Sequence, residues 1–309
     1  GIGIVPVKFV IPFAHLKVHS YDGQGLEEFI YLTLGERLIF SDIGDEFLKM
    51  ILSPGFGFGK HMNPCIDCKI LMLKEAVRVM CRHKAQFVVT GEVLGQRPMS
   101  QHRRALNDIE KESGLSGLLL RPLSAKLLSP TLPEENKWVD RARLFDFSGR
   151  SRLNQLKLSR RLKISGLPNA SGGCLLTDRK FSARLRDLMG HNNLDKKNID
   201  LLKIGRHFRI NNRLKLIVGR NEEENKVLEK SVHESSFLFY PDEMTAGPTA
   251  LACGDLFPPE ALLCAEIVCS YCDVREGRAE IFYRETGKKN ALSVFACPGD
   301  RDKFRKFLI

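Results

Sequence analysis

Apolar and polar positions over the first 125 residues alternate between strand-like and helix-like spacing. Runs rich in β-branched or aromatic residues predict short buried strands, and runs with helical apolar spacing predict amphipathic helices. The predicted strands are 2–13, 38–43, 85–95 and 115–123. The predicted helices are 26–38, 45–52, 69–84 and 102–114. Because strands alternate with helices, residues 1–125 are expected to form an α/β domain with a parallel sheet.

The pattern changes after this point. Residues 126–195 form a small basic segment with two predicted helices, 138–164 and 180–191, joined by a loop rich in Gly, Ser and Asn. From residue 200 to residue 309 the pattern is that of an α+β domain. It opens with a predicted hairpin over 204–220, in which two asparagines form the turn. The helices and strands that follow are predicted at 221–232, 237–241, 249–254, 258–274, 279–285 and 291–298.

Charge adds a second distinction between these regions. The chain has a net charge of +11, and residues 141–190 hold 12 Lys and Arg against 3 Asp and Glu. A concentrated basic stripe is typical of a surface that binds a phosphate backbone, although a solvated basic helix face is the alternative. The arginines of this stripe that we expect to contact nucleic acid are Arg150, Arg152, Arg160, Arg161, Arg184 and Arg186.

The sequence contains no apolar run of membrane-spanning length, and its start does not resemble a signal peptide. It contains nine cysteines, whose spacing does not resemble a small disulfide framework. Both features favour a reducing, cytoplasmic location, where thiols can serve metal binding or catalysis.

Two cysteines, Cys65 and Cys68, lie in the stretch NPCIDCK at the predicted start of a helix. A helix N-terminus favours the thiolate, which is both the nucleophile and the metal ligand. Cys174, in the loop SGGCLLTD, is the best third thiol. Three protein ligands with one open position would describe a reactive metal centre, whereas the alternative is a set of buried, inert thiols.

The remaining cysteines are interpreted as core residues. Cys264, Cys269 and Cys272 lie among apolar residues at helical spacing, and Cys81, Cys253 and Cys297 are placed in the same class. The glycine-rich stretch 55–60 could approach a phosphate closely, but a lone glycine-rich loop is weak evidence for a nucleotide site.

Several long motifs resemble the tRNA thiouridylases of the PP-loop ATP-pyrophosphatase superfamily. The resemblance covers roughly residues 1–190 and rests on GFGFGKHMNPCIDCKILMLKEA, FVVTGEVLGQRPMSQHRRAL, LRPLSAKLLSPTLPE, FSGRSRLNQ and SGGCLLTD. It implies a PP-loop fold and an enzyme that adenylates a tRNA uridine with ATP and Mg²⁺, after which a sulfur species displaces AMP. The sulfur donor would be a protein persulfide or sulfide.

The resemblance also implies roles for residues of this chain. Cys65, Cys68 and Cys174 match the positions that can hold a 4Fe-4S cluster with one iron open to sulfur. A persulfide variant needs only Cys68 and Cys174, with Asp67 or Glu92 as an acid or base. The residues expected to bind ATP, at the carboxyl end of a predicted strand, are Thr90, Gly91, Glu92, Gln96 and Arg97.

One motif of that superfamily is absent from the sequence. The ATP loop Ser-Gly-Gly-x-Asp-Ser has no match, since Leu175 and Leu176 replace its Asp and Ser after Ser171-Gly172-Gly173. The loop is expected upstream of residue 2. Because the chain begins with Gly, truncation is favoured over a true loss of ATP binding.

The C-terminal region is similar to the NFACT-type RNA-binding domain, on the stretches IVGRNEEENKVL, AGPTALACG and PPEALLCAEIVCSYC. Together these features predict a tRNA thiouridine synthase. The first alternative is an RNA-binding protein whose PP-loop domain is degenerate. The second is a PP-loop enzyme that modifies a nucleobase without thiolation and needs no trio of cysteines.

Overall fold

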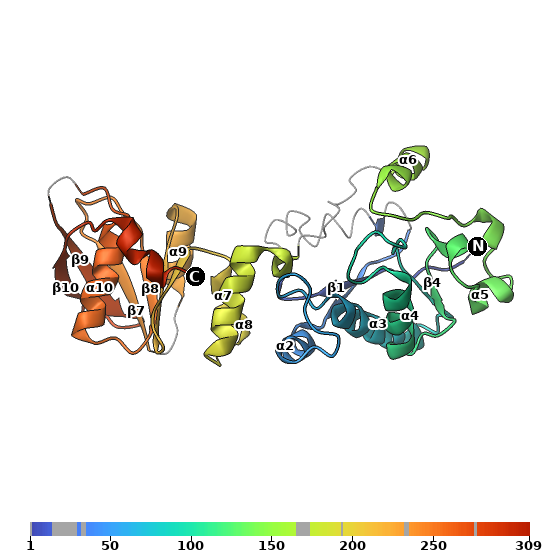
Figure 1. Cartoon of the computed structure of the whole chain (residues 1–309). Coiled ribbons are helices and arrows are strands. Elements are labelled where there is room, and N and C mark those ends of the chain that lie inside the picture. Colours follow the sequence, from blue (N-terminus) through green and yellow to red (C-terminus); the bar gives the residue numbers. More distant parts are fainter. Residues whose placement is uncertain are drawn as a thin grey trace. The chain divides into compact units, whose positions relative to one another are not determined.

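A computed structural model describes residues 2–13, 30–31, 35–164, 174–192, 194–231, 235–274 and 277–309. The chain divides into two compact units, an N-terminal unit of residues 1–182 and a C-terminal unit of residues 183–309 (Figure 1). Most of the basic segment 126–195 therefore groups with the N-terminal unit, and the boundary of the C-terminal unit precedes residue 200. No helix in the described ranges is long and apolar enough to cross a membrane.

The strands of the N-terminal unit pair in parallel, as predicted for an α/β domain. Strand β1 (Val7–Val10) pairs with β2 (Ile39–Asp42), and β3 (Val88–Val89) pairs with β4 (Leu119–Leu120). These pairs form two separate two-stranded sheets. The expected single, continuous parallel sheet is therefore not found among the described residues, where β3 and β4 are each only two residues long.

The helices of this unit follow the predicted apolar spacing, since α2 (Gly44–Leu52), α3 (Cys65–Arg82) and α4 (Arg103–Glu112) all fall where helices are predicted. The predicted helix 26–38 lies mostly outside the described residues. The other short elements of the unit are η2 (Ala125–Leu127), α5 (Leu132–Glu135), η3 (Arg141–Arg143), α6 (Leu153–Arg161) and η4 (Leu175–Thr177).

The predicted long helix over 138–164 is wrong for its first half, where only the short η3 forms before α6. The amide of Phe145 donates to the carbonyl of Pro122 at 2.9 Å, and the amide of Phe147 donates to Leu123 at 2.8 Å. These bonds to a distant segment hold residues 144–148 in an extended conformation. Tertiary hydrogen bonding therefore overrides local helix propensity here.

The core of the N-terminal unit lies where α3 and α4 pack on the β3–β4 pair. Its buried members include Ile70, Leu73 and Ile109, with Leu119 from β4. At the other strand pair, Phe13 packs against Phe47 of α2 and Phe181, with ring centroids 5.4 Å and 6.0 Å apart. The first turn of α3, which carries Cys65 and Cys68, therefore belongs to a helix that is packed into this core.

The C-terminal unit contains one antiparallel sheet of six strands in the order β10-β9-β7-β8-β6-β5. The predicted α+β pattern and the hairpin of β5 and β6 are confirmed. The strands are β5 (Arg206–Asn211), β6 (Leu214–Val218), β7 (Ser236–Pro241), β8 (Ala250–Gly254), β9 (Ala279–Glu285) and β10 (Leu292–Ala296). The helical elements are α7 (Arg179–Gly190), which begins in the N-terminal unit, α8 (Lys196–Leu202), α9 (Glu222–Lys230), α10 (Pro258–Cys269) and η5 (Arg301–Phe307).

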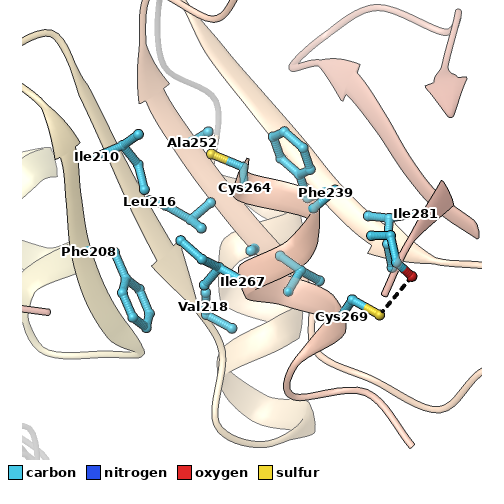
Figure 2. Packing of buried hydrophobic residues seen from close by; sticks show 14 of the residues in the cluster. Phe208, Ile210, Leu216, Val218, Phe239, Ala252, Cys264, Ile267, Cys269 and Ile281 are labelled. Atoms are coloured by element: carbon cyan, nitrogen blue, oxygen red, sulfur yellow. Dashed lines mark hydrogen bonds between the residues drawn. The ribbon is translucent and has the colours of Figure 1, made fainter. Parts of the chain in front are cut away.

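Both faces of this sheet are covered, because successive residues of a strand point to opposite faces. On one face Leu216 joins the cluster formed with α10, and on the other Ile217 joins the cluster that contains Leu228 of α9. Figure 2 shows Cys264 and Cys269 of α10 among the apolar side chains of the first cluster. Their predicted place in a core is confirmed.

Candidate thiol centre

The loop between α2 and α3 is closed by the first turn of α3. The carboxylate of Asp67 accepts hydrogen bonds from the amide of Gly55 at 2.8 Å and from the amide of Phe56 at 3.1 Å. The glycine-rich loop was considered as a loop that could approach a phosphate. In the structure, two of its amides bind the carboxylate of Asp67 instead. Asp67 has a structural role at the helix start, where a negative charge is favourable.

Asn63 positions the first cysteine of the pair. Its side-chain nitrogen donates to Sγ of Cys65 at 3.3 Å and to Sδ of Met99 at 3.6 Å. A Cβ atom on Gly59 would lie 2.5 Å from that nitrogen, so any other residue at this position would displace the side chain of Asn63. The turn before α3 is therefore built around the contact between Asn63 and Cys65.

Cys174 reaches this turn from more than one hundred residues further along the chain. The amide of Met62 donates to the carbonyl of Leu176 at 3.3 Å, and the amide of Leu175 donates to the carbonyl of Phe13 at 2.9 Å. Leu176 is fully buried and anchors the segment. The loop that carries Cys174 therefore lies beside the loop that precedes Cys65.

The three thiols affect one another electrostatically. The pKa of Cys68 is raised to about 12, chiefly by burial and next by the neighbouring thiol of Cys174, while Lys69 opposes the shift. Burial also raises the pKa of Cys174; the backbone amide of Leu176 opposes that shift, and Cys65 adds to it. Coulomb interactions weaken with distance, so these mutual effects agree with the backbone bond from Met62 to Leu176 in placing the loop of Cys174 near Cys65 and Cys68.

The protonation state of Cys68 differs from the expected one. A helix N-terminus was expected to favour the thiolate, but the cost of burying a negative charge is larger, and Cys68 is protonated at neutral pH. A bound cation would reverse this balance, because it stabilises the thiolate directly. Metal binding at these thiols would therefore release protons.

The donor chemistry of this trio fits an iron–sulfur cluster or another thiolate-bound metal. Within the described parts of the chain, however, no three His, Cys, Asp or Glu side chains are already arranged around one point. Cys65, Cys68 and Cys174 fit a cluster by donor type and proximity, and their side chains would have to turn towards a common centre.

A buried ion pair lies at the carboxyl ends of β3 and β4. The guanidinium of Arg121 lies 3.2 Å from the carboxylate of Glu92 and 2.8 Å from that of Glu110. Lys69, which follows Cys68, lies 3.5 Å from the other oxygen of Glu92. The sequence pointed to this region but did not identify Arg121 as the partner of both carboxylates. The position of Arg121, a basic residue directly after an apolar strand, is the signal that could have identified it.

This network bears on the predicted ATP residues. The hydroxyl of Thr90 donates to Glu92 at 3.2 Å, and Gln96 exchanges hydrogen bonds with Gln155 of α6 at 3.1 and 3.3 Å. Arg97 is close enough to lower the pKa of Cys174. Glu92 and Gln96 are therefore engaged within the protein, and their contacts give no support to a nucleotide at this position. ATP binding by Thr90, Gly91, Glu92, Gln96 and Arg97 stays a prediction.

The predicted RNA-binding arginines fall into different environments. Arg150, Arg160 and Arg161 are exposed, and Arg186 of α7 is exposed as well. Arg152 is half-buried at the start of α6. Arg184 donates to the backbone carbonyls of Leu202 and Gly205 at 2.9 and 3.0 Å, which gives it a structural role in its own unit. RNA contact by these arginines stays a prediction.

Two of the cysteines that were predicted to be core residues are not buried. Cys81, near the end of α3, and Cys297, after β10, are exposed. Both lie at the end of an element, where the apolar spacing no longer indicates which face is covered. Cys253 is only partly exposed, and burial raises its pKa to about 11.

Comparison with known proteins gives one family match. The family described as the NFACT protein RNA binding domain matches residues 205–307, which include the whole six-stranded sheet, α9 and α10. The C-terminal unit therefore contains an RNA-binding domain of this family, and RNA is its indicated partner. No curated protein matches the chain.

Among solved structures, one similar chain is the C-terminal part of the fibronectin/fibrinogen-binding protein from Streptococcus suis. It is 12% identical, with a TM-score of 0.31, and the alignment covers 86% of this chain and 97% of that one. A likeness at this TM-score carries no argument about the fold or the function.

Proposed function

We propose that this protein is an RNA-binding sulfurtransferase that replaces a uridine oxygen of tRNA with sulfur. The observation that carries the proposal is that the loop of Cys174 lies beside the turn before Cys65 and Cys68, joined by the bond from the amide of Met62 to the carbonyl of Leu176. The mutual effects of the three thiols on their pKa values agree with this placement. An RNA-binding domain in the same chain supplies the partner class. The PP-loop resemblance supplies the reaction class.

The chemistry requires an activated oxygen. A uracil carbonyl oxygen is a poor leaving group. Transfer of the adenylyl group of ATP to this oxygen would release pyrophosphate, and attack of sulfide on the same carbon would then expel the oxygen as part of AMP. We infer no ATP contact from Glu92 or Gln96, because both are engaged within the protein. ATP enters this proposal from the resemblance alone.

Cys65, Cys68 and Cys174 would hold a 4Fe-4S cluster, which supplies an iron position open to sulfide when it is bound. The protein's own contribution is positional. Asn63 orients Cys65 through its amide nitrogen, and Asp67 closes the glycine-rich loop against the helix start. Lys69 places a positive charge beside Cys68, where it favours the thiolate that either a cluster or a persulfide requires.

The proposal is tested by analysing anaerobically purified protein for iron and acid-labile sulfide, and by nucleoside analysis of tRNA after incubation with ATP and sulfide. We expect iron and sulfide in the parent and their loss in Cys65→Ala, Cys68→Ala and Cys174→Ala. Cys272→Ala is the matched control. Cys272 belongs to a pair with the same spacing in the other unit, so this variant should contain as much iron and sulfide as the parent. Iron that survives in Cys174→Ala, or that is lost in Cys272→Ala, would contradict the assignment.

A second candidate is an RNA-binding protein without catalysis. It is favoured by the family match over 205–307 and by the internal partners of Glu92 and Gln96. Protein that contains no iron and sulfide, forms no thiolated nucleoside, and still binds tRNA would support this candidate over the enzyme.

A further inference from the structure

An open hollow of about 240 Å³ lies between α6 and the extended segment before it. Its lining combines two aromatic rings with amide, apolar and cationic side chains. The lining residues are Phe145, Phe147, Asn154, Lys157, Leu158 and Arg161. The volume is below the roughly 300–1,000 Å³ of pockets for drug-sized ligands, so the hollow suits a single ring system.

The aromatic floor of this hollow is held in place by its backbone. Phe145 and Phe147 lie two residues apart in an extended segment, so their side chains point to the same side. Their ring centroids are 4.9 Å apart. Besides the two amide bonds to the segment after β4, the carbonyl of Phe147 accepts from the hydroxyl of Ser124 at 2.6 Å. The rings thus form a fixed surface.

The cationic wall comes from α6. Lys157 and Arg161 are four residues apart, so they lie on one face of the helix, and both are exposed. Gln155 on the same helix exchanges hydrogen bonds with Gln96 in the loop after β3, which ties α6 to the rest of the unit. The positive charges are therefore presented beside the aromatic floor.

We propose that this hollow binds one unpaired RNA nucleotide, with its base against Phe145 and Phe147 and its phosphate near Lys157 and Arg161. Aromatic side chains stack on unpaired bases, and cationic side chains pair with the phosphate backbone. Asn154 can offer both a donor and an acceptor to the edge of the base. The proposal rests on the proposed function in one respect, that RNA is the partner.

An acidic peptide would also be attracted to the surrounding segment, where 12 Lys and Arg stand against 3 Asp and Glu. The paired rings favour RNA, because a base offers a π-face of matching size and a carboxylate does not. A peptide that competes for the hollow better than single-stranded RNA would overturn the proposal.

The test is the binding of the full chain to a fluorescent single-stranded RNA that contains 2-aminopurine, whose emission reports stacking. Phe145→Leu/Phe147→Leu keeps apolar side chains but removes both rings. We expect affinity to fall by roughly 5- to 150-fold per lost stacked base, with loss of the 2-aminopurine quenching and an unchanged salt dependence. An unchanged affinity and unchanged quenching would overturn the proposal.

A second variant, Lys157→Gln/Arg161→Gln, tests the hollow without touching the aromatic floor. Affinity should fall, and the slope of log K against log salt should become shallower by about 1.4, because two contacts to a single strand are lost. Arg104→Gln/Lys111→Gln, with both residues exposed on α4, removes the same charge elsewhere and is the matched control. Equal losses in the two variants would mean that net charge alone is responsible.

The fold of each variant is checked by the emission of Trp138, the single tryptophan, which packs on Phe87 in the same unit. Failure of the proposed function is read separately, from iron, sulfide and thiolated nucleosides. Ring-dependent RNA binding without thiolation would overturn the sulfurtransferase alone. Thiolating protein that binds RNA equally well without the rings would overturn the nucleotide site alone.

Discussion

Two Cys-x-x-Cys pairs of identical spacing lie in the two units and have different surroundings. Cys65 and Cys68 begin α3, whereas Cys269 ends α10 and Cys272 follows it. Burial raises the pKa of both Cys68 and Cys272 to about 12, so acidity does not separate the pairs. A third thiol lies near each pair as well, since Cys174 raises the pKa of Cys68 and Cys297 raises that of Cys269. What separates the pairs is the set of hydrogen bonds that their sulfurs make.

Both sulfurs of the second pair donate hydrogen bonds to backbone carbonyls of their own unit. Sγ of Cys269 donates to the carbonyl of Ala296 at 3.3 Å, and Sγ of Cys272 donates to Val268 at 3.4 Å (Figure 2 shows the first contact). At the first pair, Sγ of Cys65 instead accepts from the amide of Asn63. Cys-x-x-Cys spacing therefore indicates neither a site nor a core position until the partners of its sulfurs are known.

The largest expected effect is that of pH on thiol alkylation, and it should be the same for both pairs. The thiolate is the reactive form, so the alkylation rates of Cys68 and Cys272 should each rise about tenfold per pH unit, or about a thousandfold from pH 7 to pH 10. Peptide mass spectrometry after iodoacetamide treatment measures both rates, with the exposed Cys81 as an accessible reference.

The comparison is sharpened by adding ferrous iron and sulfide anaerobically before alkylation. Labelling of Cys68 should then be suppressed and labelling of Cys272 should not change. Rapid labelling of Cys68 at pH 7 would show that burial does not control its pKa, and equal protection of both cysteines would remove the distinction between the pairs.

The next largest effect is expected beside the first pair. Arg121→Ala leaves the buried carboxylate of Glu92 without its guanidinium partner, which should destabilise the N-terminal unit by about 3–5 kcal/mol. Urea unfolding followed by the emission of Trp138 measures this change. Arg104→Ala, on the exposed face of α4, should change stability by less than about 0.5 kcal/mol. A similar result for both variants would mean that the buried ion pair does not support the site.

A smaller effect is expected in the C-terminal unit. Cys264→Ser places a hydroxyl in the apolar cluster under α10, where it should cost about 1–3 kcal/mol. Cys65→Ser, at a partly exposed position, should cost less than about 0.5 kcal/mol. Thermal unfolding by circular dichroism compares the two. A greater loss at Cys65 would reverse the assignment of the core pair and the site pair.

The smallest effect is expected for the residue that orients Cys65. Asn63→Ala removes the donor to Sγ and the acceptor for the amide of His61, and should cost about 0.5–1.5 kcal/mol. Asn136→Ala, an exposed position at the end of α5, is the control and should be close to neutral. Loss of iron from Asn63→Ala without a change in stability would show a role in the thiol site beyond folding.

Sequence patterns predicted the elements best where each one is covered by its neighbours. All six strands of the C-terminal unit fall where strands were predicted, and β6 is the clearest case, because a strand that is buried on both faces needs apolar residues at nearly every position. The turn of the hairpin was predicted one residue too early, since Asn211 pairs with Leu214 at the end of β5 and the turn is formed by Asn212 and Arg213. α8 was not predicted, and the extended segment at Phe145 was predicted as helix. Short elements depend on partners more than on their own periodicity.

The sequence by itself determined that a thiol pair begins a helix, that positive charge gathers between residues 141 and 190, and that an RNA-binding domain follows. It could name Cys174 only as a candidate. The tertiary structure alone decided that Cys174 approaches Cys68, that Arg121 neutralises Glu92, and that two phenylalanines face the cations of α6. The physical reason is that local periodicity records which face of an element is buried, whereas these contacts join segments far apart in the chain.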